Sequence, residues 1–393
     1  MCILKRTAVG GLSLLALALA APATSFGQPT APAAAQTTAD PDAAERTALG
    51  REFAGLLLGS LDFRAQTIRK LQNNASTATL MRLRPDWSDL YLKTADETVQ
   101  EELPVAQAVM GDALAASISV DELRVGVAFF KTQSGAELLH AMTQSTEGQT
   151  VTPFSDRAKK EIAAFSATPK GAGFMKHLAD SSKLMEPLAA KTDGVTVGKF
   201  LRAFGGKSEA IEKTRLSGSS PATEAQSLGA RLVRTTHYMD GYEDGMTRGI
   251  EKGIAKHEGE VDANLLQTLG ASMKDAVVLD EGEVVRSIGN SVAKAYTLEE
   301  LRAAVPFLES STGQVFIAEQ RDKAAGRKSR TLTQSQILVI NRFAATKAGA
   351  SFFKKGDLLD RAAQDAQNDY LPLILATSLR LSGERVLKSL GAT

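Results

Sequence analysis

A ten-residue signature that occurs four times constrains the fold of this chain more than any other feature of its sequence. It reads Phe, two residues, Ser or Thr, two residues, Gly, two residues, and then Leu or Phe. With 15 Phe and 32 Gly in 393 residues, chance predicts only about 0.2 matches to its first three defined positions. The copies are Phe129-Thr132-Gly135-Leu138, Phe165-Thr168-Gly171-Phe174, Phe307-Ser310-Gly313-Phe316 and Phe343-Thr346-Gly349-Phe352.

The spacing of the copies predicts a tandem duplication. Their first Phe residues lie 36 positions apart within each pair, and the two pairs lie 178 positions apart. Apolar residues recur at helical spacing along nearly the whole chain, and strict alternation is almost absent, which predicts an all-α fold. We therefore expect two similar helical halves, over residues 44–204 and 225–393. Residues 205–224 contain Gly205-Gly206 and a Ser- and Gly-rich run, which predicts a linker between them.

The same helix-start device occurs at matching positions of the two halves. Ser119 is followed three residues later by Glu122, and Thr297 by Glu300, which is the pattern of a capping box. Thr168 is followed by Pro169, as expected of an N-cap and the first residue of a helix. We therefore interpret each signature as a joint: the Phe ends one helix, the hydroxyl begins the next, and the Gly lets the two backbones approach.

The N-terminus has the pattern of a secretory signal. Lys5 and Arg6 precede an apolar stretch of about fourteen residues and a run of small residues. We expect residues 1–27 to be a signal peptide, residues 28–43 to be a disordered tether, and the protein to reside in the periplasm. The only cysteine is Cys2, within that signal, so the exported chain would have no thiol. The signal is too short to serve as a permanent span, so we expect no membrane-spanning segment after cleavage.

Charge and motif content argue against several functional classes. Without residues 1–27 the chain has 44 basic and 45 acidic side chains, a balance that does not favour nucleic acid as a partner. There is no HExxH metal motif and no Gly-x-Ser-x-Gly, so neither a zinc protease nor a serine esterase is indicated. We expect no catalytic residues, no cofactor and no bound metal.

The densest group of reactive side chains lies between His237 and Asp244. On one helix, His237, Asp240 and Asp244 would share a face that could hold a divalent metal, although a surface or packing role is the simpler interpretation. The same segment has glycines at strict four-residue spacing, a pattern that permits close helix approach. We interpret this as a candidate interaction face for another helix or an extended ligand, with an ordinary crossing inside the fold or a broken helix as the alternatives. The face comprises Gly241, Gly245, Gly249 and Gly253, together with His237 and Asp240.

One further polar segment carries a cluster of cations. Residues 321–330 contain five Lys or Arg side chains, and we expect either a solvated hairpin loop or a contact with an acidic envelope surface. His140 and His177 are expected to pack or to lie at the surface.

Two segments of about 20 residues resemble a known family. Residues 119–139 (SVDELRVGVAFFKTQSGAELL) and 297–317 (TLEELRAAVPFLESSTGQVFI) are similar to the core of the exported bacterial family called domain of unknown function 2059. The resemblance implies an exported helical protein without an agreed activity, present here as two tandem copies, and supplies no catalytic residues. Two departures are Phe307-Leu308 in place of an aromatic pair, and Pro306, which we expect to bend or shorten its helix.

These observations favour a non-enzymatic binding or scaffold protein of the bacterial cell envelope. The alternative is a periplasmic carrier or chaperone that shelters an apolar ligand or segment. The expected partner is thus an envelope protein or an apolar ligand, and the sequence does not choose between them.

Overall fold

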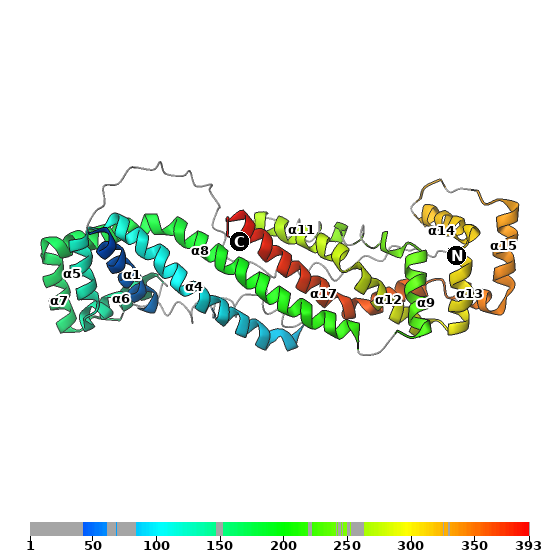
Figure 1. Ribbon diagram of the computed structural model, residues 1–393, viewed down its shortest axis with the longest axis horizontal. Coiled ribbons are helices and arrows are strands. Elements are labelled where there is room, and N and C mark those ends of the chain that lie inside the picture. Colours follow the sequence, from blue (N-terminus) through cyan, green and yellow to red (C-terminus); the bar gives the residue numbers. More distant parts are fainter. Residues whose placement is uncertain are drawn as a thin grey trace. The chain divides into compact units, whose positions relative to one another are not determined.

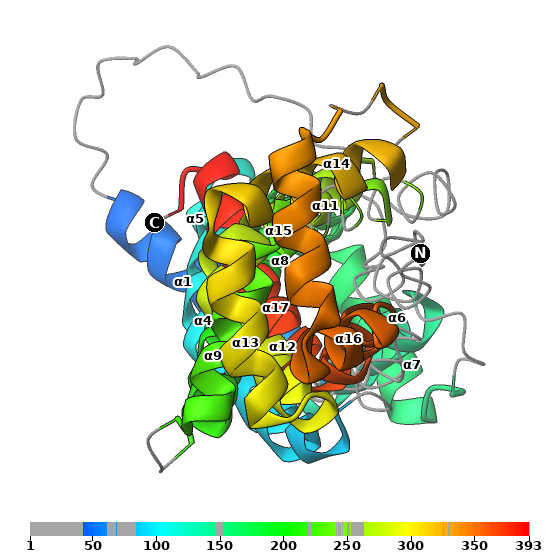
Figure 2. The same ribbon diagram turned by 90° about the vertical axis from the view of Figure 1, so that its right-hand side faces the viewer.

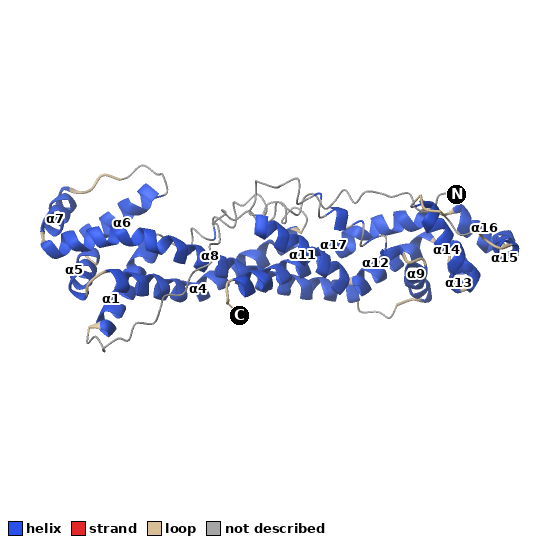
Figure 3. Ribbon diagram, turned by 90° about the horizontal axis from the view of Figure 1, so that it is seen from above, coloured by secondary structure: helices blue, strands red, loops and turns tan. Residues whose placement is uncertain are grey.

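The computed structural model is all-α over the residues it describes, which are 42–60, 84–146, 152–218, 222–240, 263–324, 326–328 and 331–392, with isolated residues at 68, 242, 245, 247–249 and 252. No strand occurs among these residues (Figures 1 and 3). The expected signal peptide (1–27) lies outside them, as does the tether (28–43) except for its last two residues. The elements are α1 (Ala43–Ser60), η3 (Pro85–Trp87), α4 (Ser88–Ser117), α5 (Val120–Phe130), α6 (Gln133–Thr146), α7 (Asp156–Ala167), α8 (Pro169–Ser217), α9 (Glu224–Thr235), α11 (Ala263–Leu279), α12 (Glu281–Ala295), α13 (Leu298–Glu309), α14 (Ser311–Ala324), α15 (Gln334–Ala345), α16 (Lys347–Lys354) and α17 (Leu358–Ser389).

The described residues form two compact units, each with its own core. Unit 1 contains residues 84–87 and the described residues of 201–382, and unit 2 contains residues 42–60, 68, the described residues of 88–200, and 383–392. Helices α8 and α17 contribute residues to both units. In unit 2, Phe53, Phe130 and Phe174 are nearly inaccessible and lie at the centre of the core. In unit 1 the corresponding core contains Leu232, Leu301 and Tyr370.

Each signature forms the same joint between two helices. The hydroxyl donates to the carbonyl of the preceding Phe and accepts from the amide of the following Gly, as in Thr168, where these distances are 2.8 and 3.0 Å. A Cβ on the Gly would lie 2.0–2.3 Å from that same Phe carbonyl oxygen in all four copies, so no larger residue fits without displacing backbone. The hydroxyls of Thr132, Ser310 and Thr346 make the same two bonds.

The two joints of each pair are connected by stacked aromatic rings. Phe129 stacks on Phe165 with ring centroids 4.2 Å apart and planes inclined by 9°. Phe307 stacks on Phe343 with centroids 4.1 Å apart and an inclination of 7°. The 36-residue spacing in the sequence therefore corresponds to a face-to-face contact in both places.

The predicted capping boxes are confirmed. Ser119 at the start of α5 accepts from the Glu122 amide, and the Glu122 carboxylate accepts from the Ser119 amide at 3.2 Å. Thr297 and Glu300 make the reciprocal pair at the start of α13, where the Thr297 amide lies 2.7 Å from the carboxylate. Helix α13 contains Pro306 and extends to Glu309, so the proline does not end it early.

Two local expectations were wrong. Residues 205–217 were expected to be linker but are the last part of α8, and only the segment after Ser217 leaves the helix. Gly205 serves a close helix contact rather than a break, because a Cβ there would lie 2.3 Å from the Arg380 amide nitrogen in α17. In the basic segment 321–330, Arg321 and Lys323 lie within α14 rather than in a loop.

Candidate functional site

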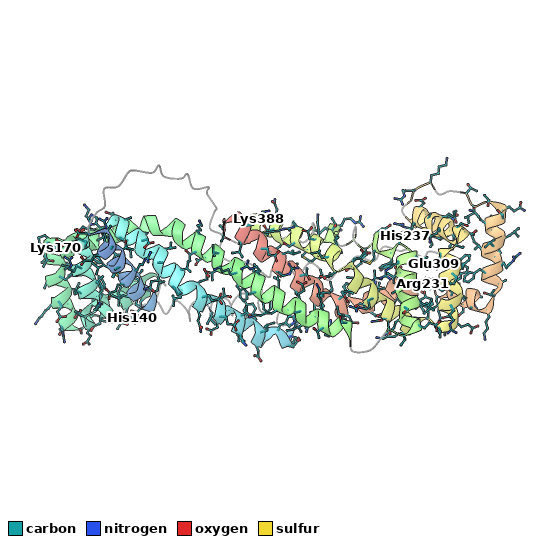
Figure 4. All side chains as sticks on the ribbon, viewed as in Figure 1. His140, Lys170, Arg231, His237, Glu309 and Lys388 are labelled. Atoms are coloured by element: carbon teal, nitrogen blue, oxygen red, sulfur yellow. The ribbon has the colours of Figure 1, made fainter. Side chains whose placement is uncertain are left out.

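His237 and Asp240 lie close to each other, and each contacts a side chain of α14. His237 follows the end of α9 in a turn with φ of 53°, and its Nε2 lies 3.2 Å from the amide oxygen of Gln314 in α14 (Figure 4). Asp240 accepts from Arg321 at 3.0 Å and lies 3.8 Å from His237 Nδ1. Asp244, the third predicted ligand, lies outside the described residues. The arginine neutralises the one described carboxylate, so the pair is better suited to joining this segment to α14 than to holding a cation.

The tyrosines of the same segment are part of the core of unit 1. Tyr242 is 8 % exposed and meets Tyr370 edge to face with centroids 5.9 Å apart. Burial raises the pKa of the Tyr238 and Tyr242 phenols well above its usual range. Both phenols therefore stay neutral at ordinary pH, and neither is poised for proton transfer.

The glycine face is only partly described. Gly241 and Gly253 lie outside the described residues, whereas Gly245 and Gly249 are helical. A Cβ at Gly245 would meet no atom within 4 Å, so no neighbour crosses closely at this position. Gly245 is therefore not the site of a tight helix crossing inside the fold. A stripe of small residues alone does not identify a ligand either.

A buried polar cluster in unit 1 was not anticipated from the sequence. Asp280 is 2 % exposed, accepts from the Thr377 hydroxyl at 2.5 Å and lies 3.6 Å from Lys213. Burial raises the pKa of the Asp280 carboxyl, and these two neighbours oppose the rise. Glu209 is bound by Lys213 and Arg380, each at 2.6 Å. The cluster ties α8, α17 and the residue preceding α12 together, and its charges compensate one another.

A second buried carboxylate reinforces the joint of the C-terminal repeats. Glu300 accepts from Ser351 at 2.5 Å and from Lys355 at 2.8 Å, in addition to the Thr297 amide. Burial alone would raise its pKa, but these donors outweigh burial and lower the pKa of Glu300 to about 2. At the matching place in unit 2, Glu122 has the His177 imidazole at 3.2 Å, and Gly173 in place of the serine. Both carboxylates hold helices together.

The outer side of α15 is the most unusual surface among the described residues. Ile337, Leu338 and Val339 are consecutive, large and apolar, and they are 42 %, 62 % and 43 % exposed. Helix α15 packs on α14 and α16, has no fully buried residue, and lies at the edge of unit 1, where no other described element covers it (Figures 1 and 2). We call Ile337, Leu338 and Val339 the α15 patch.

The corresponding helix of unit 2 has the opposite surface. Positions 178 residues before the α15 patch are Lys159, Lys160 and Glu161 of α7. Lys159 and Lys160 are exposed, while Glu161 accepts from Ser134 of α6 at 2.7 Å and from Arg157 of its own helix at 2.8 Å. The two helices end in the same joint and differ in what they present to solvent. Aligning residues 337–339 with residues 159–161 would have revealed the α15 patch from the sequence, because apolar residues there replace charged ones.

Within the described part of the chain, no group of three or more metal-ligating side chains gathers, and no helix has both the length and the hydropathy of a membrane span. No protein-family model, curated protein or solved structure matches the chain. The function therefore has to be inferred from the chain's own residues.

Proposed function

We propose that the protein is an exported, non-enzymatic binding or scaffold protein of the bacterial cell envelope, and that the α15 patch is its contact surface. The exposed apolar patch carries the proposal, because it lies at positions where the otherwise matching helix α7 has charged side chains. Exposed apolar surface costs solvation free energy, and clustered patches of this kind mark interaction sites. A solvated helix with no partner would be expected to resemble α7 instead.

The proposal includes a tandem duplication and the resemblance to domain of unknown function 2059. The equal stacking of Phe129 on Phe165 and of Phe307 on Phe343 supports a common origin of the two halves. So do two close helix crossings: a Cβ at Gly50 would lie 2.3 Å from the Gly111 carbonyl oxygen, and one at Gly229 would lie 2.3 Å from that of Gly289. The joints match at an offset of 178 residues, whereas α1 matches α9 at an offset of 179. One residue was therefore gained or lost between the first helix and the joints in one of the halves.

A binding rather than a catalytic role is supported by the state of the candidate reactive groups. His237 and Asp240 are engaged by Gln314 and Arg321, and the nearby phenols are buried and neutral. The buried Glu209 and Asp280 are matched by Lys213 and Arg380. These paired charges stabilise the fold and are engaged by one another rather than directed toward a substrate.

Retention by isolated cell envelopes tests the proposal. Protein from its own cells is mixed with washed envelope fragments, sedimented and quantified, beside the variant I337K/L338K/V339E, which copies the three residues of α7. We expect the variant to be retained about tenfold less, because a buried apolar side chain contributes about 1.5–3 kcal/mol on leaving water.

The matched control is V278Q/L279Q, which removes two other exposed apolar side chains of unit 1, 61 % and 62 % exposed. This control should be retained like the unmodified protein. Equal retention of all three proteins, or none for any of them, would contradict a binding role for the α15 patch. Native mass spectrometry of the same preparation would favour the carrier alternative if an apolar small molecule stayed bound.

A further inference from the structure

The α15 patch lies within a long segment that has only positive charges. Residues 323–356 contain eight Lys or Arg side chains and no Asp or Glu, in a chain that has 46 basic and 45 acidic residues in all. The rest of the chain is therefore acidic, and this segment is a local reversal of its charge. The eight cations are Lys323, Arg327, Lys328, Arg330, Arg342, Lys347, Lys354 and Lys355.

Half of these cations are exposed and have no acidic partner among the described residues. Lys323 pairs with Glu319, Arg327 with Asp322 and Lys355 with Glu300, while Arg330 lies outside the described residues. The other four are exposed, and no ion pair joins them to a carboxylate of the described residues. We call them the four free cations: Lys328, Arg342, Lys347 and Lys354.

The free cations lie on α15 and on the elements that adjoin it in the chain. Arg342 lies one helical turn after Leu338 on the same exposed side of α15, and Lys347 begins α16, which packs on α15. Lys328 lies in the connection that leads from α14 toward α15, and Lys354 ends α16. Apolar side chains and unpaired positive charges are thus presented by one group of neighbouring elements.

We propose that this surface docks on the anionic phospholipid headgroups of a bilayer, which names the partner of the proposed function and rests on it. Aliphatic side chains enter the boundary between headgroups and acyl chains, while Lys and Arg are attracted to the negative lipid charge. An acidic protein is the competing partner, but protein interfaces typically anchor on exposed Trp, Tyr and Arg, and Leu and Val are under-represented there. The α15 patch is entirely aliphatic, and the one aromatic residue of α15, Phe343, is stacked on Phe307.

Co-sedimentation with vesicles tests the inference. Protein isolated from its own cells is mixed with vesicles of phosphatidylcholine alone or of phosphatidylcholine and phosphatidylglycerol in equal amounts. We expect at least about tenfold tighter binding to the anionic vesicles, and weakening as salt shortens the range of the attraction. The variant K328Q/R342Q/K347Q/K354Q should bind these vesicles at least about tenfold more weakly, because each cation near such a surface contributes about fivefold and two of the four already account for such a loss.

A control variant removes the same net charge elsewhere. It is K93Q/K131Q/K159Q/K160Q, which replaces four exposed lysines of unit 2. Binding to anionic vesicles that is nearly unchanged in this control supports a local surface rather than a general effect of net charge. An equal loss in both variants would overturn the inference.

A fluorescent probe reports which side chains enter the lipid. With Cys2 changed to Ser, the variants L338C and K160C each have one thiol that takes an environment-sensitive dye. A blue shift on anionic vesicles at position 338, and none at 160, supports insertion of the α15 patch. The inference is overturned by no shift at position 338, by equal shifts at both, or by equal affinity for both vesicle types.

The lipid inference and the proposed function fail in different ways. If vesicles are not bound but envelope retention still depends on the α15 patch and is lost after protease treatment of the envelope, the partner is a protein and only the lipid inference falls. If the patch instead controls the oligomeric state of the purified protein, the occupant is a second copy, and the lipid inference again falls. If retention does not depend on the patch at all, both fall.

Discussion

Helices α7 and α15 end in the same joint, yet they are held to their units very differently. In α7 the side chains of Ala158 and Phe165 are buried, whereas α15 has no fully buried residue. The joints themselves are nearly superimposable in their hydrogen bonds and in the stacking of their Phe rings. The same local backbone chemistry thus sets the direction of the chain at both joints, although the two helices have different surfaces.

The carboxylates beside these joints differ in a similar way. Glu300 has Ser351 and Lys355 as partners and is 4 % exposed, while Glu122 has His177 and lies beside Gly173. The unit whose α15 is loosely packed therefore has the stronger ionic tie between α13 and α16. These contacts hold α16 to α13 although α15 itself has no fully buried residue.

Replacing the glycine in the joint after α7 or in the joint after α15 should have the largest effect on stability, and the two losses should differ. At Gly171 and Gly349 a Cβ would lie 2.0 and 2.1 Å from the carbonyl oxygen of the preceding Phe. We expect Gly171→Ala to lower the free energy of unfolding by about 3 kcal/mol, because a buried ring must shift with the backbone. Gly349→Ala should cost about half as much, since α15 can move without disturbing the core. Denaturant unfolding followed by circular dichroism measures both.

The matched control for these substitutions is Gly245→Ala. A Cβ there would meet no atom within 4 Å, and alanine favours helix over glycine by about 0.8–1 kcal/mol, so stability should be unchanged or higher. Equal losses for Gly171→Ala and Gly349→Ala would contradict the view that α15 is loosely held.

Neutralising Glu300 or Glu122 separately should give the next largest difference in the free energy of unfolding between the two sites. Glu300→Gln leaves Lys355 without its charge partner, and we expect a loss of about 2 kcal/mol near neutral pH, against about 1 kcal/mol for Glu122→Gln. The pKa of Glu300 falls from 4.5 to about 2 in the fold, so its stabilisation is complete above about pH 4.5 and is lost as the pH falls toward 2. Unfolding measured between neutral and acid pH should therefore show the gap between the unmodified protein and Glu300→Gln closing over that range. A gap that does not change with pH would rule out the ionised carboxylate as the cause.

The features that were predictable from the sequence are those set by neighbouring residues. The all-α fold, the capping boxes at Ser119 and Thr297, and the hydroxyl caps of the signature all follow from side chains within three or four residues of the groups they bind. Hydrogen-bond geometry of this short range is determined by residue type and spacing, so it can be recognised without knowledge of the fold.

The features that were not predictable depend on which distant element lies opposite a residue. Gly205 was interpreted as a break because glycine disfavours helix, yet in α8 it lets the backbone of α17 approach. Ile337, Leu338 and Val339 have the composition of a core segment and are exposed, because the fold places no described element over them. The charge compensation of Asp280 by Lys213 likewise joins residues far apart in the chain. Local sequence patterns indicate the conformation a residue favours, but they do not determine which distant element packs against it.

Exchanging the partner of Glu122 should give the smallest effect and compares the two carboxylate sites directly. His177→Lys copies Lys355 of the other unit and places an ammonium beside the Glu122 carboxylate. We expect a gain of about 0.5 kcal/mol in the free energy of unfolding near neutral pH, because the site is partly exposed to solvent and surface ion pairs are weak. Urea unfolding measures the gain, and His140→Lys is the control, since His140 contacts Gln144 rather than a carboxylate. If both substitutions change stability equally, the contact between positions 177 and 122 contributes nothing specific, and the parallel between the two sites is limited to their backbone.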